Sequence, residues 1–251
     1  MICGLRIFAD GHPGEYMLQE KIMTIPTEEV YETSEPYMAA ICGYEREGTS
    51  AQKTKKKAMQ VRESLFDGTS MDILYAPFSP DCVRPDGFLI DGVQIECSKL
   101  SGIPAESILS GYVFMFHAPM PDLSSFPVSR MYLADSWQTS FVDAGRNFIR
   151  RKFHELAGTE LSREIYITDT IAPGMCGMPA AKVKSFFELL DGSKIDIELL
   201  ESGMMNPVKS FTGIFLILDR ESVIQTSDCS QCLSGHTNCE YCKNYAERYM
   251  E

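Results

Sequence analysis

Residues 168–179 read Thr-Asp-Thr-Ile-Ala-Pro-Gly-Met-Cys-Gly-Met-Pro, and they join a predicted strand at 164–168 to a predicted helix at 180–190. Gly174 and Gly177 leave the backbone open to a closely approaching ligand, because glycine has no side chain. The N-terminus of the following helix offers free N–H groups to a carboxylate or a phosphate. This stretch is therefore a candidate ligand loop, although a Pro-Gly sequence is also typical of a plain turn.

Short elements follow this loop. Residues 195–200 and 210–218 read as strands, and the second is strongly apolar and interrupted only by Gly213. Residues 203–208 read as a turn. Glu201 comes directly after the first of these strands, so its carboxylate is a candidate to hold a ligand amine or hydroxyl. The alternative is the end of a strand that faces solvent.

Upstream of the loop, helical and strand patterns are mixed without a regular βαβ repeat. A helix is expected at 50–66, because apolar residues recur there at helical spacing. The Asp91-Gly92 pair between two apolar runs predicts a two-residue hairpin turn. This order favours an α+β fold, with a mixed or antiparallel twisted sheet and flanking helices. The other expected elements are a strand at 71–75, a hairpin at 88–95, a short helix at 104–109, a strand at 111–116 and a long helix at about 132–156.

Three regions are expected along the chain. Residues 1–90 form an N-terminal part that either completes the main domain or acts as a docking lobe, and residues 91–226 form the core domain. The aliphatic content falls near Ser227, where a cysteine cluster begins. Residues 227–251 are therefore expected to form a small metal-binding tail.

The composition is that of a folded and acidic protein. Lys and Arg number 23 against 35 Asp and Glu, which gives a formal net charge of -12. Nucleic-acid binding is not expected, because neutralising phosphates requires a basic surface. No window of 18 residues is continuously apolar, so no membrane span is expected. The first residues lack a basic segment followed by a long apolar run, so we expect a cytoplasmic protein with reduced thiols.

The nine cysteines fall into two groups. Five are scattered and are expected to be small buried hydrophobic residues; they are Cys3, Cys42, Cys82, Cys97 and Cys176. The other four form two Cys-x-x-Cys pairs separated by six residues; they are Cys229, Cys232, Cys239 and Cys242. Four thiolates that meet at one point suit Zn²⁺ or an iron–sulfur cluster, and the spacing alone does not decide between them. His236 lies between the pairs and is expected to be a polar loop residue, because four cysteines already complete a tetrahedral site.

Several short motifs follow one another in a definite order along the chain. They are Ala172-Pro173-Gly174, Leu189-Leu190, Leu200-Glu201-Ser202, Met205, Pro207, Ser210 and Gly213. This order resembles the reactivation domain of cobalamin-dependent methionine synthase, in which an Arg-x-Ala-Pro-Gly-Tyr loop precedes a helix ending in Leu-Leu. Thr-Glu-Ser and Pro-x-x-Ser-x-Ser-Gly segments then follow in that domain.

The similarity spans about residues 90–218. Within it, residues 134–144 and 103–108 resemble the free-standing, single-domain relatives of this family. Some of those relatives carry a cysteine-rich tail.

The resemblance implies a set of site residues. The family domain binds S-adenosylmethionine and caps a corrinoid, so residues 172–174 are implied to contact S-adenosylmethionine through their backbone. Asp143 and Glu201 are implied to be polar anchors, and the residues after Gly174 to face the corrin ring. Thr170 and Met175 stand where the family has arginine and tyrosine; Arg146, Arg150 and Lys209 are the candidates to supply the missing positive charge. The implied cofactor-binding residues are Asp143, Thr170, Ala172, Pro173, Gly174, Met175, Cys176, Glu201 and Ser202.

The resemblance also implies a function. The chain is expected to reactivate a corrinoid protein or a cobalamin-dependent methyltransferase by returning Co(II) to Co(I), with S-adenosylmethionine as the methyl donor. In this context the cysteine tail is expected to hold a [4Fe-4S] cluster that delivers the electron, with zinc as the alternative. The second hypothesis is a non-redox, zinc-stabilised module that binds or chaperones a corrinoid. The acidic surface is expected to help recognition of the partner protein.

Overall fold

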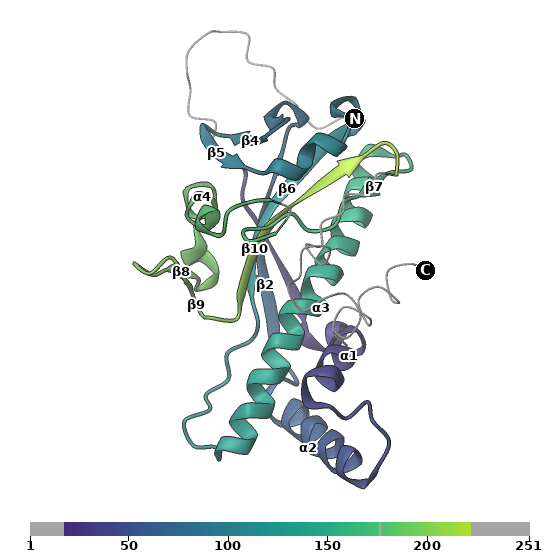
Figure 1. Ribbon diagram of the computed structural model, residues 1–251, viewed down its shortest axis with the longest axis vertical. Coiled ribbons are helices and arrows are strands. Elements are labelled where there is room, and N and C mark those ends of the chain that lie inside the picture. Colours follow the sequence, from purple (N-terminus) through teal and green to yellow (C-terminus); the bar gives the residue numbers. More distant parts are fainter. Residues whose placement is uncertain (1–17, 176, 222–251) are drawn as a thin grey trace.

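A five-stranded antiparallel sheet lies at the centre of the computed structural model, which describes residues 18–175 and 177–221 (Figure 1). The strand order is β1-β2-β6-β10-β7, and each neighbouring pair runs antiparallel. The strands are β1 (Lys21–Pro26), β2 (Ser70–Phe78), β6 (Ile108–His117), β7 (Tyr166–Ile167) and β10 (Ser210–Leu218). The first two strands thus belong to the same sheet as the strands of the expected core domain.

Both faces of the sheet are buried, which explains its long apolar strands. In β10, Phe215 belongs to one hydrophobic core and Ile214 to the other, because successive side chains of a strand point to opposite faces. The ring of Phe215 stacks on that of Phe114 from β6, with centroids 4.8 Å apart. A strand buried on both faces reads as a continuous apolar run. The bounds predicted for this strand, 210–218, are confirmed.

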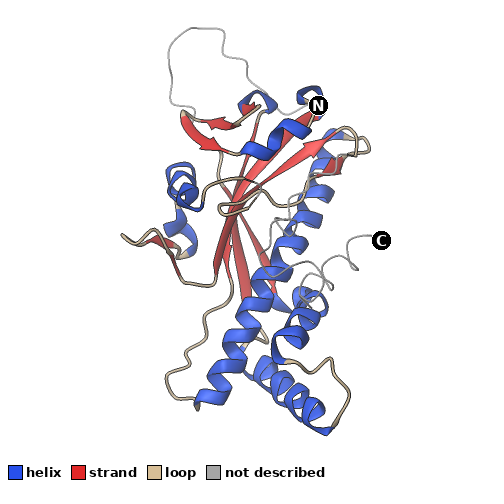
Figure 2. Ribbon diagram, viewed as in Figure 1, coloured by secondary structure: helices blue, strands red, loops and turns tan. Residues whose placement is uncertain are grey.

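Three helices lie together on one side of the sheet (Figure 2). They are α1 (Tyr31–Cys42), α2 (Thr49–Leu65) and the long α3 (Val128–Leu161). The fully buried Trp137 ties α3 to α2, because its indole N–H donates to the carbonyl oxygen of Ala58 at 2.8 Å. Gly145 lets α3 approach the sheet closely, since a Cβ there would lie 2.9 Å from the ring of Phe116. These contacts fix which face of α3 meets the sheet.

Smaller elements cover the opposite face. They are β3 (Val83–Arg84), β4 (Gly87–Ile90), β5 (Val93–Glu96), α4 (Val183–Leu189), β8 (Glu198–Leu199) and β9 (Met205–Asn206). Short 3-10 helices cover Thr27–Val30, Pro80–Cys82, Ser98–Gly102, Ala105–Ser107, Ala180–Lys182 and Gly192–Ile195. Asp91 and Gly92 both have positive φ angles, which confirms the predicted two-residue turn between β4 and β5.

The α+β class is confirmed, but several elements differ from expectation. Strand β9 lies within residues 203–208, where a turn was expected. Strand β1 was not predicted, because it lies at the sheet edge and only Ile25 in it is buried, which leaves a weak apolar pattern. The strand predicted at 195–200 is wrong over its first half, where a 3-10 helix ends in a residue with left-handed φ, Asp196. The helix predicted at 104–109 is a single 3-10 turn that leads into β6.

Within residues 18–175 and 177–221, no helix is both long and apolar enough to cross a bilayer.

Candidate functional site

The candidate ligand loop begins as an extra strand-like segment beside β10. The backbone N–H of Ile171 donates to the carbonyl oxygen of Ile214 at 2.9 Å, and the return bond is 2.7 Å long. A Cβ on Gly213 would lie 3.0 Å from both the carbonyl oxygen of Ile171 and Cγ2 of Thr170. Glycine at this position therefore lets the loop lie against β10, which explains its place in an otherwise apolar strand.

A tight turn of backbone hydrogen bonds then closes the loop. Met175 donates to the carbonyl oxygen of Ala172 at 2.9 Å, and Gly174 donates to that of Met178 at 2.9 Å. Gly174 has a φ of 82°, in the left-handed region that favours glycine. The predicted residues Ala172, Pro173, Gly174 and Met175 thus share one turn, whereas the predicted Cys176 lies outside the described residues.

Gly177 secures this turn to the 3-10 helix at Ser98–Gly102. Its φ is 72°, and a Cβ there would lie 2.0 Å from Oγ of Ser98. The backbone N–H of Ser98 also faces the carbonyl oxygen of Gly177 at 3.4 Å. A side chain at position 177 is excluded by both the backbone angle and the lack of space, so the loop depends on glycine here.

A charged pair on α3 lies beside the loop. Nη2 of Arg146 is 2.7 Å from Oδ1 of Asp143, and the two side chains are 13% and 16% exposed. The guanidinium lies over the ring of Phe211, 5.0 Å from its centroid. Nη1 of Arg146 is 3.9 Å from Sδ of Met175. Two residues implied by the resemblance, Asp143 and Met175, are therefore brought together through Arg146; we call Asp143, Arg146, Met175 and Phe211 the arginine cluster.

The other two candidates for the missing positive charge, Arg150 and Lys209, already bond to other groups of the chain. Nε and Nη2 of Arg150 donate to the carbonyl oxygens of Thr168 and Ile167 at 2.9 and 2.8 Å. These bonds hold β7 and the start of the loop against α3. Nζ of Lys209 lies 3.1 Å from Oδ2 of Asp135 and 2.9 Å from Oγ1 of Thr139. Both side chains therefore have structural roles.

Nε of Arg146, unlike the bonded nitrogens of Arg150 and Lys209, is buried and has no hydrogen-bond partner among the described residues. Leaving a buried donor of a charged group unpaired costs about 1–3 kcal/mol or more. The cluster thus holds a donor that is unsatisfied by the protein, next to the turn that the sequence singled out.

Comparison with known proteins gives one informative result. No protein-family model matches the chain, and no curated protein matches its sequence. Among solved structures it is similar to the crystal structure of the MetH reactivation domain bound to AdoHcy, with a TM-score of 0.59, 14% identity, and coverage of 86% of this chain and 84% of that chain. The chain has the MetH reactivation-domain fold. The fold expected from the order of its motifs is thereby confirmed.

Within this MetH-like fold, two implied residues lie apart from the arginine cluster. Glu201 and Ser202 are exposed in the turn between β8 and β9, which projects from the sheet (Figure 1). The hairpin is closed by a 2.9 Å bond from the N–H of Leu200 to the carbonyl oxygen of Met204. Among the described residues, no hydrogen bond or ion pair joins Glu201 or Ser202 to the loop. Their roles stay predictions.

The predicted metal ligands Cys229, Cys232, Cys239 and Cys242 lie outside the described residues of the MetH-like body. Residues 18–175 and 177–221 contain no group of three His, Cys, Asp or Glu side chains arranged to hold a metal ion. Cys97 is fully buried, and burial raises the pKa of the Cys42 and Cys82 thiols. The scattered cysteines of the described body therefore behave as packing residues.

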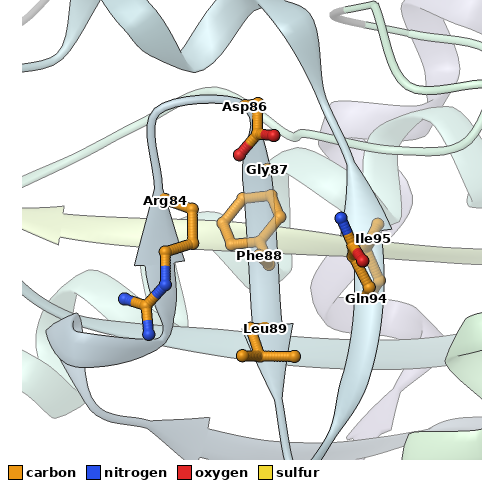
Figure 3. A pocket seen from close by; sticks show the side chains of 7 residues that line it. All are labelled: Arg84, Asp86, Gly87, Phe88, Leu89, Gln94 and Ile95. Carbon is orange, nitrogen blue, oxygen red and sulfur yellow. The ribbon is translucent and has the colours of Figure 1, made fainter.

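A shallow depression of about 210 Å³ lies on the small sheet of the MetH-like fold (Figure 3). At its side, Nη1 of Arg84 donates to the carbonyl oxygens of Asp81 and Val83, so this nitrogen is used by neighbouring backbone. Gly87 cannot be replaced there, because a Cβ would lie 2.0 Å from the carbonyl oxygen of Ile95. This depression is lined by Arg84, Asp86, Gly87, Phe88, Leu89, Gln94 and Ile95, none of which belongs to the arginine cluster.

Proposed function

We propose that this chain reactivates a corrinoid protein by returning its cobalt from Co(II) to Co(I). The observation that carries the proposal is the glycine-rich turn beside the arginine cluster, in a chain whose fold is that of the MetH reactivation domain. The resemblance of the motif order, which implies that the family's ligand loop is this same turn, supports the proposal. The partner is a corrinoid protein or a cobalamin-dependent methyltransferase, and the chain's net charge of -12 would favour a partner with a basic docking surface.

S-adenosylmethionine fits the donors and acceptors of this site. The turn is held by its own backbone bonds, so it is preorganised to receive a ligand without first becoming ordered. Asp143 supplies a carboxylate, and Arg146 has an unpaired buried donor that an anionic group would satisfy. When bound, S-adenosylmethionine would supply the methyl group that converts Co(I) to methyl-cobalamin, leaving AdoHcy. The residues that hold it are Asp143, Arg146, Ala172, Pro173, Gly174 and Met175, with Glu201 and Ser202 as further contacts.

The four tail cysteines supply the donor set for the electron-transfer centre. Two Cys-x-x-Cys pairs provide four soft thiolates, which suit a [4Fe-4S] cluster. Such a cluster would supply one electron, which is the change that converts Co(II) to Co(I). An external low-potential reductant would have to restore that electron after each turnover. A colourless preparation with stoichiometric zinc would contradict this part of the proposal and favour a non-redox corrinoid-binding or chaperone module.

Calorimetry with the full chain tests the ligand part of the proposal. We expect saturable binding of both S-adenosylmethionine and AdoHcy. The two compounds share the amino-acid group and the other atoms that would contact the backbone of the turn. ATP serves as a matched control, since it carries the adenosine but has a triphosphate in place of the amino-acid end. Absence of binding at millimolar AdoHcy would contradict the assignment of this site.

A further inference from the structure

The unpaired Nε of Arg146 requires an explanation. Buried polar groups in folded proteins nearly always have a partner, so each exception points to strain, to a function, or to a bound water, ion or ligand. The other buried side-chain atoms without a partner among the described residues belong to Tyr44, Arg62 and Arg130. Arg146 is distinguished from them by its contact with the candidate turn through Met175.

The surroundings of Arg146 prepare it for an anionic group. One of its nitrogens is held by Asp143 at 2.7 Å, and the ring of Phe211 supports the flat face of the guanidinium. A third contact is made only by the thioether of Met175, which is a weak acceptor on a flexible side chain. A carboxylate is a far stronger acceptor for a guanidinium and can accept two N–H bonds at once. An incoming carboxylate would therefore replace the thioether of Met175 as the acceptor at Nη1 of Arg146, while the backbone of Met175 stays in the turn.

The loop offers no competing cation at this point. Thr170 stands where the resemblance implies an arginine, and it is 8% exposed with its methyl group packed over Gly213. Arg150 donates to the backbone carbonyl oxygens of β7 and the start of the loop, and Lys209 is paired with Asp135. The positive charge that contacts the turn is thus carried by α3 rather than by the loop.

The charge of the pair defines the class of ligand. Arg146 and Asp143 neutralise each other, so a ligand with a carboxylate alone would add an uncompensated negative charge next to Asp143. A ligand that carries both a carboxylate and an ammonium group leaves the site neutral, because each charge meets its opposite. The α-amino-acid end of S-adenosylmethionine or AdoHcy has these two groups.

We propose that Arg146 on α3 binds the carboxylate of a zwitterionic α-amino-acid group, and so determines that this site takes an amino-acid-bearing nucleoside rather than a nucleoside alone. This inference rests on the proposed function for the identity of the nucleoside. It assigns to α3 a recognition role that the resemblance places on the loop.

Calorimetry with two ligands tests the role of Arg146. AdoHcy carries the amino-acid end, whereas 5′-methylthioadenosine has the same adenosine and a thioether but lacks it. We expect Arg146→Ala to weaken AdoHcy binding by about 10- to 100-fold, as for the loss of charge-assisted hydrogen bonds. Binding of methylthioadenosine should stay within about twofold, because that ligand has no carboxylate. Arg146→Lys should give an intermediate loss for AdoHcy, since lysine keeps the charge without the fork.

Arg151→Ala is the matched control, because Arg151 is an exposed arginine of the same helix that lies over Phe148. It should bind both ligands as the unmodified chain does. Equal weakening of both ligands by Arg146→Ala would show a structural role and overturn the inference. Unchanged AdoHcy binding in Arg146→Ala would overturn it while leaving the proposed function in place. Failure of the unmodified chain to bind either nucleoside would overturn both.

Discussion

Replacing Cys232 by serine is expected to remove the metal centre and to abolish reduction of a Co(II) corrinoid. Cys232 belongs to the first Cys-x-x-Cys pair, and a cluster that loses one of four thiolates loses a ligand that serine replaces poorly. Iron analysis of the anaerobically purified protein should fall from about four atoms per chain to a small residue. Transfer of electrons to the corrinoid should fall with it.

The matched control for this variant is Cys82→Ser. Cys82 is a half-buried thiol of the described body, outside the tail, and burial raises the pKa of its thiol. This variant should keep its iron and its corrinoid-reducing activity. Undiminished reduction by Cys232→Ser would contradict the assignment of the electron-transfer centre to the tail, whatever metal the tail holds.

Truncation of Trp137 to alanine is expected to lower the free energy of unfolding by about 3–5 kcal/mol. The indole is fully buried, stacks on Phe141 with centroids 5.6 Å apart, and donates to the carbonyl oxygen of Ala58. Its removal leaves a cavity and detaches α2 from α3. Urea unfolding followed by circular dichroism measures the loss as a lower transition midpoint at an unchanged slope.

Two further variants separate the contributions of the indole. Trp137→Phe keeps most of the apolar contact and removes the N–H, so it should cost about 1–3 kcal/mol. Tyr132→Ala removes a side chain of the same helix that is 55% exposed, and should change stability by no more than about 0.5 kcal/mol. A loss below 1 kcal/mol for Trp137→Ala would contradict the packing described between the two helices.

The fold could be predicted where one local signal was strong. Strand β10 is apolar on both faces and the Asp91-Gly92 turn has its own backbone chemistry, so both were predicted correctly. Strand β1 could not be recognised, because an edge strand with one buried residue has almost no hydrophobic pattern. Strand β8 was placed too early, since Ile195 is buried from the end of a 3-10 helix and Ile197 from the connection after it, rather than from a strand.

For the site too, local signals were predictable from the sequence and long-range packing was not. The sequence singled out residues 172–175 as a turn, because proline and glycine report backbone geometry directly. It named Asp143 by resemblance and left three cations as equal candidates for the missing charge. Only the packing of α3 beside the loop distinguishes Arg146 from the other two, since periodicity within a helix does not say which loop its face meets. Nothing in the described contacts joins Glu201 to this cluster, so its predicted role still rests on the resemblance.

Anaerobic electron transfer to a corrinoid tests the central claim most directly. The full chain is reduced, freed of excess reductant by gel filtration, and mixed with Co(II) cobinamide as the probe corrinoid. Co(II) has an unpaired electron and Co(I) has none, so electron paramagnetic resonance follows the reaction. The account predicts that the Co(II) signal disappears in proportion to the reduced protein added. Persistence of the full Co(II) signal beside protein that remains reduced would contradict it.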